Sequence, residues 1–300
     1  MHYIRAMAQI SLSSLLPARL QVLLPSRYRS YRHPIVSVVR LSGAIGAVTP
    51  FRSGLAMSNV AQMLERAFSM PGAKAVAIVV NSPGGSAAQS HLIFRRIRSL
   101  AEEKKIPVFA FVEDAAASGG YMIACAADEI YADPASIVGS IGVVSAGFGF
   151  QELIARIGVE RRVHTAGESK AMLDPFRPEN PEDVARLKGL QSKIHEVFMD
   201  LVRTRRGEKL NETYEDLFSG AFWVGAEAVD LGLVDGLGDI RSTLRERFGE
   251  DVQFRMIEPA RPPLLARLVG RRSVTGSGLI DPAEVVGALE ERAAWARLGL

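Results

Sequence analysis

The feature that most constrains the fold is an alternation of strand-like and helix-like segments that begins after Pro34. A β-branched run at residues 35–43 ends in glycine, and a second run, "AVAIVVNSPGG" at residues 75–85, is apolar almost throughout. Continuous apolar strands are typical of sheets that are covered on both faces. Between these two runs, residues 54–68 carry apolar side chains at helical spacing. The alternation predicts an α/β domain with a mainly parallel sheet and packed helices.

The same alternation continues towards the C-terminus. Asn180 is expected to cap a long helix, and Pro181 suits its first turn. Two shorter helices and the glycine-rich "VDLGLVDGLGDI" close the predicted core. The further elements expected are helices over residues 86–103, 150–157 and 181–206, a final helix from about Asp281, and strands over residues 107–113, 129–133 and 159–165.

Charge is unevenly distributed along the chain. The net charge is only +3 over 300 residues, yet no acidic residue precedes Glu65. Residues 1–33 are therefore interpreted either as a basic amphipathic segment that rests on anionic lipid or as a loosely docked extension. The arginines that precede Glu65 are Arg5, Arg19, Arg27, Arg29, Arg32, Arg40 and Arg52.

Three regions are predicted from these patterns. They are a basic extension at residues 1–33, a catalytic domain at residues 34–250, and a C-terminal extension with a terminal helix at residues 251–300. No apolar run reaches the roughly 18–20 residues that a transmembrane helix needs. Membrane contact is thus expected to be peripheral, and a cytoplasmic location stays open. The single cysteine, Cys125, excludes an internal disulfide.

Three glycine-containing turns follow strand-like runs. They are "NSPGGS" at residues 81–86, "ASGGY" at residues 117–121 and "GSIGV" at residues 139–143. Sites in open α/β sheets collect at the carboxyl ends of strands, so the three turns are expected to converge. The amides of the first turn are suited to holding an oxyanion, although an ordinary strand-to-helix turn explains the same residues.

Ser118, in the second turn, has two interpretations. It is either the N-cap of a helix that starts at Gly119, or a nucleophile whose neighbouring amide binds the oxyanion. A nucleophile needs a base, and His91, His164 and His195 form no recognisable triad with a carboxylate. Lys170 lies between a strand-like run and an apolar loop, where desolvation would lower its pKa enough to make it a base. The alternative is a surface loop lysine that pairs with Glu168.

Four sequence blocks resemble the signal peptide peptidase A (protease IV) family of Ser-Lys serine peptidases. The blocks are "VNSPGGS", "ASGGYMIACAADEIYADPASIVGSIGV", "GESKAMLDPFRP" and "FSGAFWVGAEAVDLGLVDGLG", in family order over roughly residues 35–240. The resemblance implies a Clp protease/crotonase-like fold in a bacterial cell. Longer members of the family carry two tandem copies of this domain, and this chain is similar to the short, single-copy type.

The resemblance also implies a role for each matching residue. Ser118 is the nucleophile, and Lys170, 52 positions later, is the general base. Ser140 orients the lysine, and the amides of Gly85 and Gly119 form the oxyanion hole. No metal, cofactor or nucleic acid is expected. The expected partners are peptide substrates, such as signal peptides or other short or unfolded membrane-associated peptides, and further copies of the chain in a ring.

Two other functions stay open at this point. A crotonase-like acyl-CoA enzyme has a similar glycine-rich oxyanion hole but uses acidic residues as acid or base. An inactive scaffold in a membrane assembly would need no chemistry. Together, Ser118 and Lys170 favour the serine endopeptidase, which hydrolyses peptide bonds through an acyl-enzyme.

Overall fold

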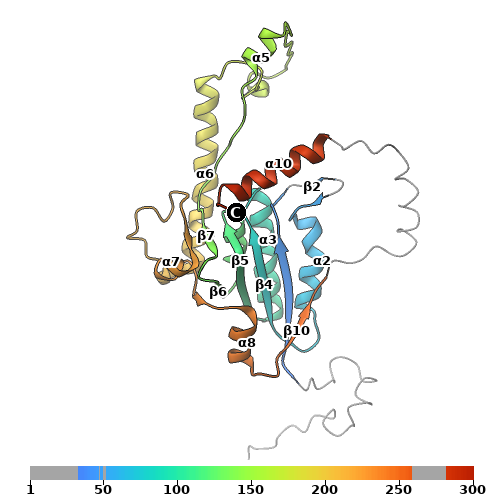
Figure 1. The fold of residues 1–300 in the computed structure, drawn as a ribbon, viewed down its shortest axis with the longest axis vertical. Helices are drawn as coiled ribbons and strands as arrows, with labels where there is room; N and C mark the ends of the chain where they lie inside the picture. The colour runs from blue at the N-terminus through green and yellow to red at the C-terminus, as the bar shows by residue number, and fades with distance from the viewer. Residues whose placement is uncertain (1–32, 47, 50–51, 259–281) are drawn as a thin grey trace, which may run out of the picture.

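The computed structural model describes residues 33–46, 48–49, 52–258 and 282–300. Its centre is a sheet with strand order β10-β1-β4-β5-β6-β9 (Figure 1), in which every neighbouring pair is parallel. This confirms the predicted α/β class with a mainly parallel sheet. The strands are β1 (Ile35–Ser42), β4 (Ala73–Ser82), β5 (Val108–Ala117), β6 (Glu129–Ala132), β7 (Ile137–Gly139), β8 (Phe222–Val224), β9 (Gly236–Leu237) and β10 (Gln253–Met256), with a separate antiparallel pair formed by β2 (Val48–Thr49) and β3 (Arg52–Ser53).

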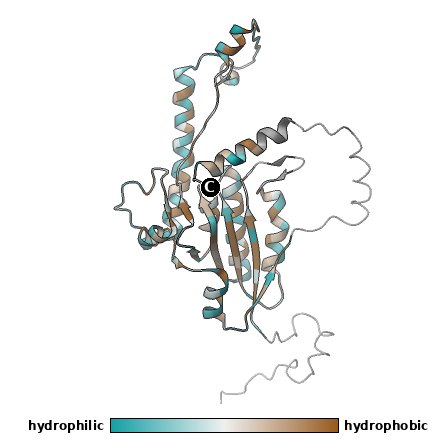
Figure 2. Cartoon of the chain, in the orientation of Figure 1, coloured by the Kyte–Doolittle hydropathy of each residue, from teal (hydrophilic) through white to brown (hydrophobic). Residues whose placement is uncertain are grey.

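The central strands are apolar because both faces of the sheet are covered. On β4, Val76, Ile78 and Val80 belong to one buried cluster, whereas Ala75, Ala77 and Val79 belong to another. Successive side chains of a strand point to opposite faces of the sheet, so the two clusters lie on opposite faces. Helices α2 (Met57–Phe68) and α3 (Ala87–Lys104) supply residues to the first cluster, and α8 (Ile240–Phe248) supplies Leu244 to the second. The apolar colour in Figure 2 follows these strands.

Helix α6 (Pro181–Arg206) has the predicted bounds. The Asn180 side chain accepts a hydrogen bond from the Glu182 amide at 3.0 Å, so the predicted N-cap is confirmed. Only the C-terminal third of the helix is buried, at Phe198, Leu201, Val202 and Arg206. The rest extends away from the sheet together with residues 144–180, here called the arm, which include α5 (Gln151–Arg156) and the short 3-10 helix η3 (Glu168–Ala171) (Figure 1).

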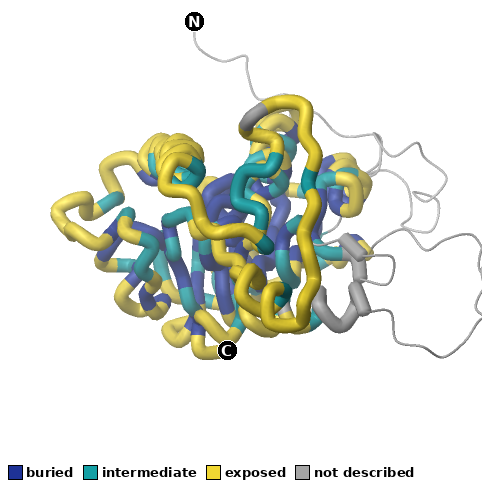
Figure 3. Tube along the Cα trace, turned by 90° about the horizontal axis from the view of Figure 1, so that it is seen from above, coloured by how far each residue is buried: buried dark blue, intermediate teal, exposed yellow. Residues whose placement is uncertain are grey.

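The strand predicted over residues 159–165 is wrong. These residues have no regular secondary structure, and all of them are exposed except the half-buried Val163. They lie on the arm, where no other strand pairs with them. A strand needs a partner for its backbone groups, and this segment meets water instead. Exposed segments of this kind surround a buried centre in Figure 3.

The C-terminal helix α10 (Pro282–Ala296) confirms the expected final helix. Beyond its end, the buried Leu298 packs on Ala115 and Ala117 of β5, together with the partly buried Trp295. The chain end therefore covers the carboxyl end of β5. Strand β10 pairs with β1, although the sequence assigned its residues to the C-terminal extension. The predicted basic extension falls almost entirely outside the described residues.

Among the helices of the described ranges, none combines the length and the apolar character that crossing a bilayer requires. The two further predicted helices of the core are α7 (Gly225–Asp230) and α8. Helix α4 (Gly119–Ala124) is entirely buried beneath the end of β5. The architecture therefore places the strand-to-helix junctions at the carboxyl edge of the sheet, where the three glycine turns lie.

Candidate active site

Ser118 occupies the junction between β5 and α4. Its backbone has φ 51° and ψ −119°, in the left-handed half of conformational space that a serine rarely adopts. It stands at the N-cap position, but its side chain makes no capping hydrogen bond. A serine held in a strained strand-to-helix turn, with a hydroxyl that does not cap, is typical of a nucleophile elbow. A helix cap therefore explains where Ser118 lies in the chain. It does not explain the strained backbone of Ser118 or a hydroxyl that makes no capping bond.

The turn at Gly84 and Gly85 lies directly against Ser118. A Cβ atom on Gly84 would stand 2.8 Å from the Ser118 Cβ, and one on Gly85 would stand 2.2 Å from the Ile45 carbonyl oxygen. Their φ angles are 102° and 141°, so both the conformation and the contact require glycine. Within the described residues, the recorded hydrogen bonds include none donated by the amides of Gly85 and Gly119. These amides can therefore donate to a ligand.

The third turn meets Ser118 from the other side. Strand β7 pairs with β5, with Gly139 opposite Ala117, and the Ser118 amide donates to the Gly139 carbonyl at 2.8 Å. Ser140 follows with φ 53°, and its amide donates to the Ala221 carbonyl at 2.7 Å. The three glycine turns thus converge as expected. The structure brings together Ser118, Ser140, Gly85 and Gly119.

Lys170 does not lie in this cluster. It is exposed on η3, and the adjacent Ser169 hydroxyl accepts a hydrogen bond from Arg186 near the start of α6 at 3.1 Å. Further along α6, His195 contacts Ile141, the residue directly after Ser140. His195 therefore shows which part of α6 lies beside the cluster. His195 lies nine positions after Arg186, or about 14 Å further along the helix axis. The expected pairing of Lys170 with Glu168 falls outside the described side chains.

His195 is a residue near the site for which sequence reasoning found no role. Its Nε2 lies 3.0 Å from the carbonyl oxygen of Ile141, directly after Ser140. The sequence shows only a histidine within a long helix, more than 50 residues from that turn. Only the packing of α6 against the end of β7 makes the contact, so no local signal identifies it.

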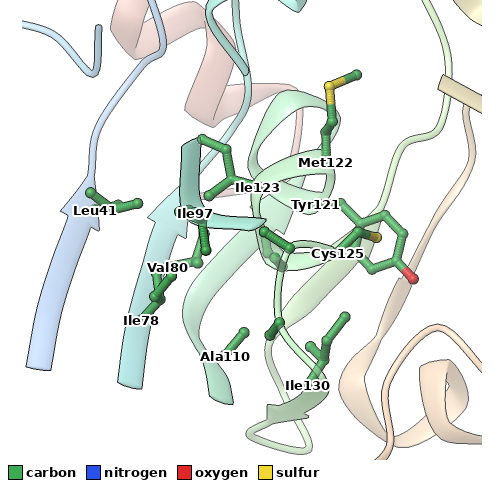
Figure 4. Packing of buried hydrophobic residues seen from close by; sticks show 14 of the residues in the cluster. Leu41, Ile78, Val80, Ile97, Ala110, Tyr121, Met122, Ile123, Cys125 and Ile130 are labelled. Atoms are coloured by element: carbon green, nitrogen blue, oxygen red, sulfur yellow. The ribbon is translucent and has the colours of Figure 1, made fainter. Parts of the chain in front are cut away.

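Tyr121 on α4 and Cys125 directly after it belong to a cluster of buried hydrophobic residues (Figure 4). The Tyr121 hydroxyl donates to the Leu233 carbonyl at 2.7 Å, and the buried Arg206 donates to Asp235 at 2.7 Å. Burial raises the pKa of the Tyr121 hydroxyl and raises the pKa of the Cys125 thiol to about 12. A thiol that stays protonated is a poor nucleophile. Cys125 is therefore a packing residue, and Ser118 is the nucleophile candidate of this region.

Comparison with known proteins identifies relatives that differ in length. Two proteins described as Na(+)/H(+) antiporter NhaA, from Brucella abortus and Brucella melitensis, are 53% identical over 299 residues, which is 97% of this chain and 40% of each relative. The chain therefore spans less than half of these relatives, and the antiporter description applies to the whole Brucella proteins. A solved membrane-bound stomatin-specific protease matches 81% of this chain at 18% identity, with a TM-score of 0.49.

Other relatives are described as proteases. The chloroplastic serine protease SPPA of Arabidopsis thaliana is 33% identical over 210 residues, covering 68% of this chain and 31% of the relative. A putative protease of Synechocystis is 33% identical over 202 residues, covering 65% of this chain and 72% of the relative. The model of peptidase family S49 matches residues 101–251, half of the chain. The chain belongs to peptidase family S49, a family of serine-type peptidases.

Proposed function

We propose that the protein is a serine endopeptidase in which Ser118 attacks the peptide carbonyl and Lys170 is the base. The observation that carries the proposal is the strained backbone of Ser118, at the point where all three glycine turns meet. The sheet holds the hydroxyl at a fixed place, next to the amides of Gly85 and Gly119, which donate to no acceptor among the described residues. Such preorganised donors stabilise a developing oxyanion.

The chemistry balances with these groups alone. The Ser118 Oγ bonds to the carbonyl carbon while its proton passes to neutral Lys170 Nζ, and the amides of Gly85 and Gly119 hold the oxyanion. The C–N bond then breaks, and Lys170 gives its proton to the leaving amine. A water molecule then attacks the ester carbon while Lys170 takes its proton; the C–Oγ bond breaks, and Lys170 returns the proton to Ser118 Oγ. Ser140 holds the lysine amine in place. Each oxyanion donor contributes about 3–4 kcal/mol to lowering the barrier.

Lys170 reaches Ser118, in this proposal, from a neighbouring copy of the chain. The exposed position of Lys170 on the arm supports this arrangement. So does an apolar stripe on α6, where Leu190, Ile194 and Val197 are 48%, 41% and 51% exposed. Their spacing of four and three residues places them on one helix face. A second copy that covers this stripe would stand beside the segment that carries Lys170, because Arg186 of the same helix binds Ser169.

The substrates we propose are signal peptides and other short or unfolded peptides near a membrane. Two observations support this. The protease relatives include proteins described as the serine protease SPPA and as a putative signal peptide peptidase SppA. Residues 1–33 are basic and free of acidic residues, which suits peripheral contact with anionic lipid. A ring of copies would present several such segments to one membrane surface.

Hydrolysis of casein and of a synthetic signal peptide tests the proposal. Ser118→Ala and Lys170→Ala are each expected to lower kcat by at least ~10³-fold while unfolding at the wild-type temperature. Ser192→Ala and Lys188→Ala, on the exposed face of α6, are matched controls and should keep full activity. Full activity in either active-site variant would contradict the proposed dyad.

A further inference from the structure

We infer that His195 is a positioning residue that fixes the turn carrying Ser140 and, through that turn, the nucleophile Ser118. The inference rests on the proposed function. It assigns a role to a histidine for which the sequence shows no serine-histidine-carboxylate arrangement. His195 touches neither of the reacting atoms, so its effect is indirect.

The contact is a hydrogen bond from the middle of α6. His195 is half-buried, and its Nε2 lies 3.0 Å from the carbonyl oxygen of Ile141. A carbonyl oxygen only accepts, so Nε2 must carry the hydrogen and donate it. The same nitrogen therefore cannot take the proton of Ser118 while the bond exists. The geometry separates His195 from the role of general base and gives it a structural one.

On its other sides the turn makes backbone hydrogen bonds, and the ring of Trp223 stands against Gly139. Gly139 accepts from the Ser118 amide at 2.8 Å, and the Ser140 amide donates to Ala221 at 2.7 Å. Ser140 has φ 53°, a conformation that costs a serine energy and persists only where neighbours enforce it. The side chain of Ile141 is completely buried. Among the described residues, the His195 side chain donates to the Ile141 carbonyl of this strained turn.

Helix α6 also contacts the far end of α4 and the segment that carries Lys170. Near its C-terminus, Arg205 donates to the Cys125 carbonyl at 2.9 Å, at the end of the helix that begins after Ser118. Near its N-terminus, Arg186 binds Ser169, next to Lys170. One helix thus contacts the turn of Ser140 and the far end of α4 in its own site, and also the segment whose Lys170 would serve the neighbouring copy. Loss of the His195 bond would free the turn and displace both serines relative to the oxyanion amides.

Such a displacement affects the chemical step more than substrate binding. A misplacement of about 1 Å can cost about 100-fold in rate. We expect His195→Leu to lower kcat by ~10- to 100-fold while KM stays within about twofold of wild type. His195→Gln keeps an N–H donor at similar reach and should restore most of kcat. His91→Leu is the control, because His91 is a half-buried helical histidine that stacks on Phe94.

Two measurements on the full-length protein test the inference. One is kcat and KM on the signal peptide, and the other is the rate at which a fluorophosphonate probe modifies Ser118. Slow modification of His195→Leu, with rescue by His195→Gln and no effect of His91→Leu, supports the inference. Equal modification rates, or a glutamine variant as slow as the leucine variant, would overturn it. If His195→Leu does not fold, the glutamine variant is compared with His195→Asn, whose shorter side chain cannot reach Ile141.

The same series separates this inference from the proposed function. If the probe does not modify Ser118 in the wild-type protein, or if Ser118→Ala keeps full activity, the proposed function itself is wrong. If the probe modifies Ser118 at the same rate in every His195 variant, only the positioning role of His195 is wrong. A change in KM at constant kcat would likewise overturn it, because it would indicate a binding role.

Discussion

At the scale of single residues, backbone strain is concentrated at the candidate site. Four non-glycine residues in the described ranges have positive φ angles, and Ser118 and Ser140 are two of them. Each such conformation costs of the order of 1–3 kcal/mol, so its persistence needs support from the surrounding structure. Here the support comes from pairing between β5 and β7 and from glycines that let backbone approach closely. The site is thus built into the edge of the sheet.

Gly85→Ala is expected to abolish hydrolysis and destabilise the fold. The new Cβ would stand 2.2 Å from the Ile45 carbonyl oxygen, so the turn and its amide must move. Gly189→Ala is the control, because nothing lies within 4 Å of a Cβ at this position on α6. That control should keep activity and stabilise the protein by about 0.5–1 kcal/mol. Peptide hydrolysis and urea unfolding measure both effects, and an active Gly85→Ala variant would contradict the account.

Asp235 is expected to make stability depend on pH in acid. Burial raises the pKa of its carboxyl, but hydrogen bonds from Arg206, Lys209 and the Ile130 amide outweigh burial and hold that pKa below its ordinary value. A lowered folded-state pKa contributes stability above the unfolded pKa of about 3.9, and this contribution is lost as pH falls through the folded pKa.

Asp235→Asn tests this linkage. At pH 7 the variant leaves Arg206 buried without its counter-charge, which should cost about 3 kcal/mol of unfolding free energy. At pH 3 and below the difference from wild type should shrink, because the wild-type carboxyl itself becomes protonated. Urea unfolding at both pH values gives the comparison. The same difference at pH 7 and in acid would show that the ion pair does not control the acid stability.

At the scale of elements, local signals in the sequence predict most of the architecture. Apolar runs give β4 and β5, and the Asn180 cap followed by Pro181 gives the start of α6 to the residue. The glycine turns predict where the site lies. The segment at residues 159–165 has strand-like composition, yet it lies on the exposed arm without a partner strand. Whether a segment pairs with another strand depends on the tertiary structure, so its composition alone does not predict it.

The difference between local sequence signals and tertiary contacts also explains which parts of the site the sequence predicts. The positions of Ser118, Ser140 and the glycines follow from strand ends, because parallel strands end at one edge of a sheet. The place of Lys170 depends on the path of the arm, and the contact of His195 with Ile141 depends on how α6 packs. Both are set by long-range packing, so neither appears in local sequence.

The C-terminal helix offers a test at this scale. Leu298 is buried against Ala115 and Ala117, so Leu298→Ala should lower the free energy of unfolding by about 2 kcal/mol. Leu289→Ala, at a position that is 61% exposed, should change stability by less than about 0.5 kcal/mol. Urea unfolding followed by tryptophan fluorescence measures both. Equal stability of the two variants would show that the end of the chain does not dock on β5 in solution.

At the scale of the whole molecule, the arm is an exposed extension that lies away from the sheet (Figure 1). It carries Lys170 away from Ser118, next to a helix with an exposed apolar stripe. A base supplied by a neighbouring copy accounts for both observations. It also makes activity a property of the assembly, because no single copy would contain a complete dyad.

Co-expression of Ser118→Ala with Lys170→Ala tests the shared site. Each variant alone should be inactive, whereas mixed assemblies contain some sites with an intact serine from one copy and an intact lysine from its neighbour. Random mixing in a ring should restore about a quarter of wild-type activity. Peptide hydrolysis by the purified mixture gives the answer, with mass measurement to confirm the assembly. A mixture as inactive as its components would place both residues in one chain.

The central claim is that Ser118 is the nucleophile, and covalent labelling tests it most directly. A fluorophosphonate probe is reacted with the full-length protein, which is then digested, and the modified peptide is identified by mass spectrometry. The account predicts a single modification on Ser118, in the peptide containing "ASGGYMIACAADE", and none in Ser118→Ala. Modification of a different serine, or equal labelling of Ser118→Ala, would contradict it.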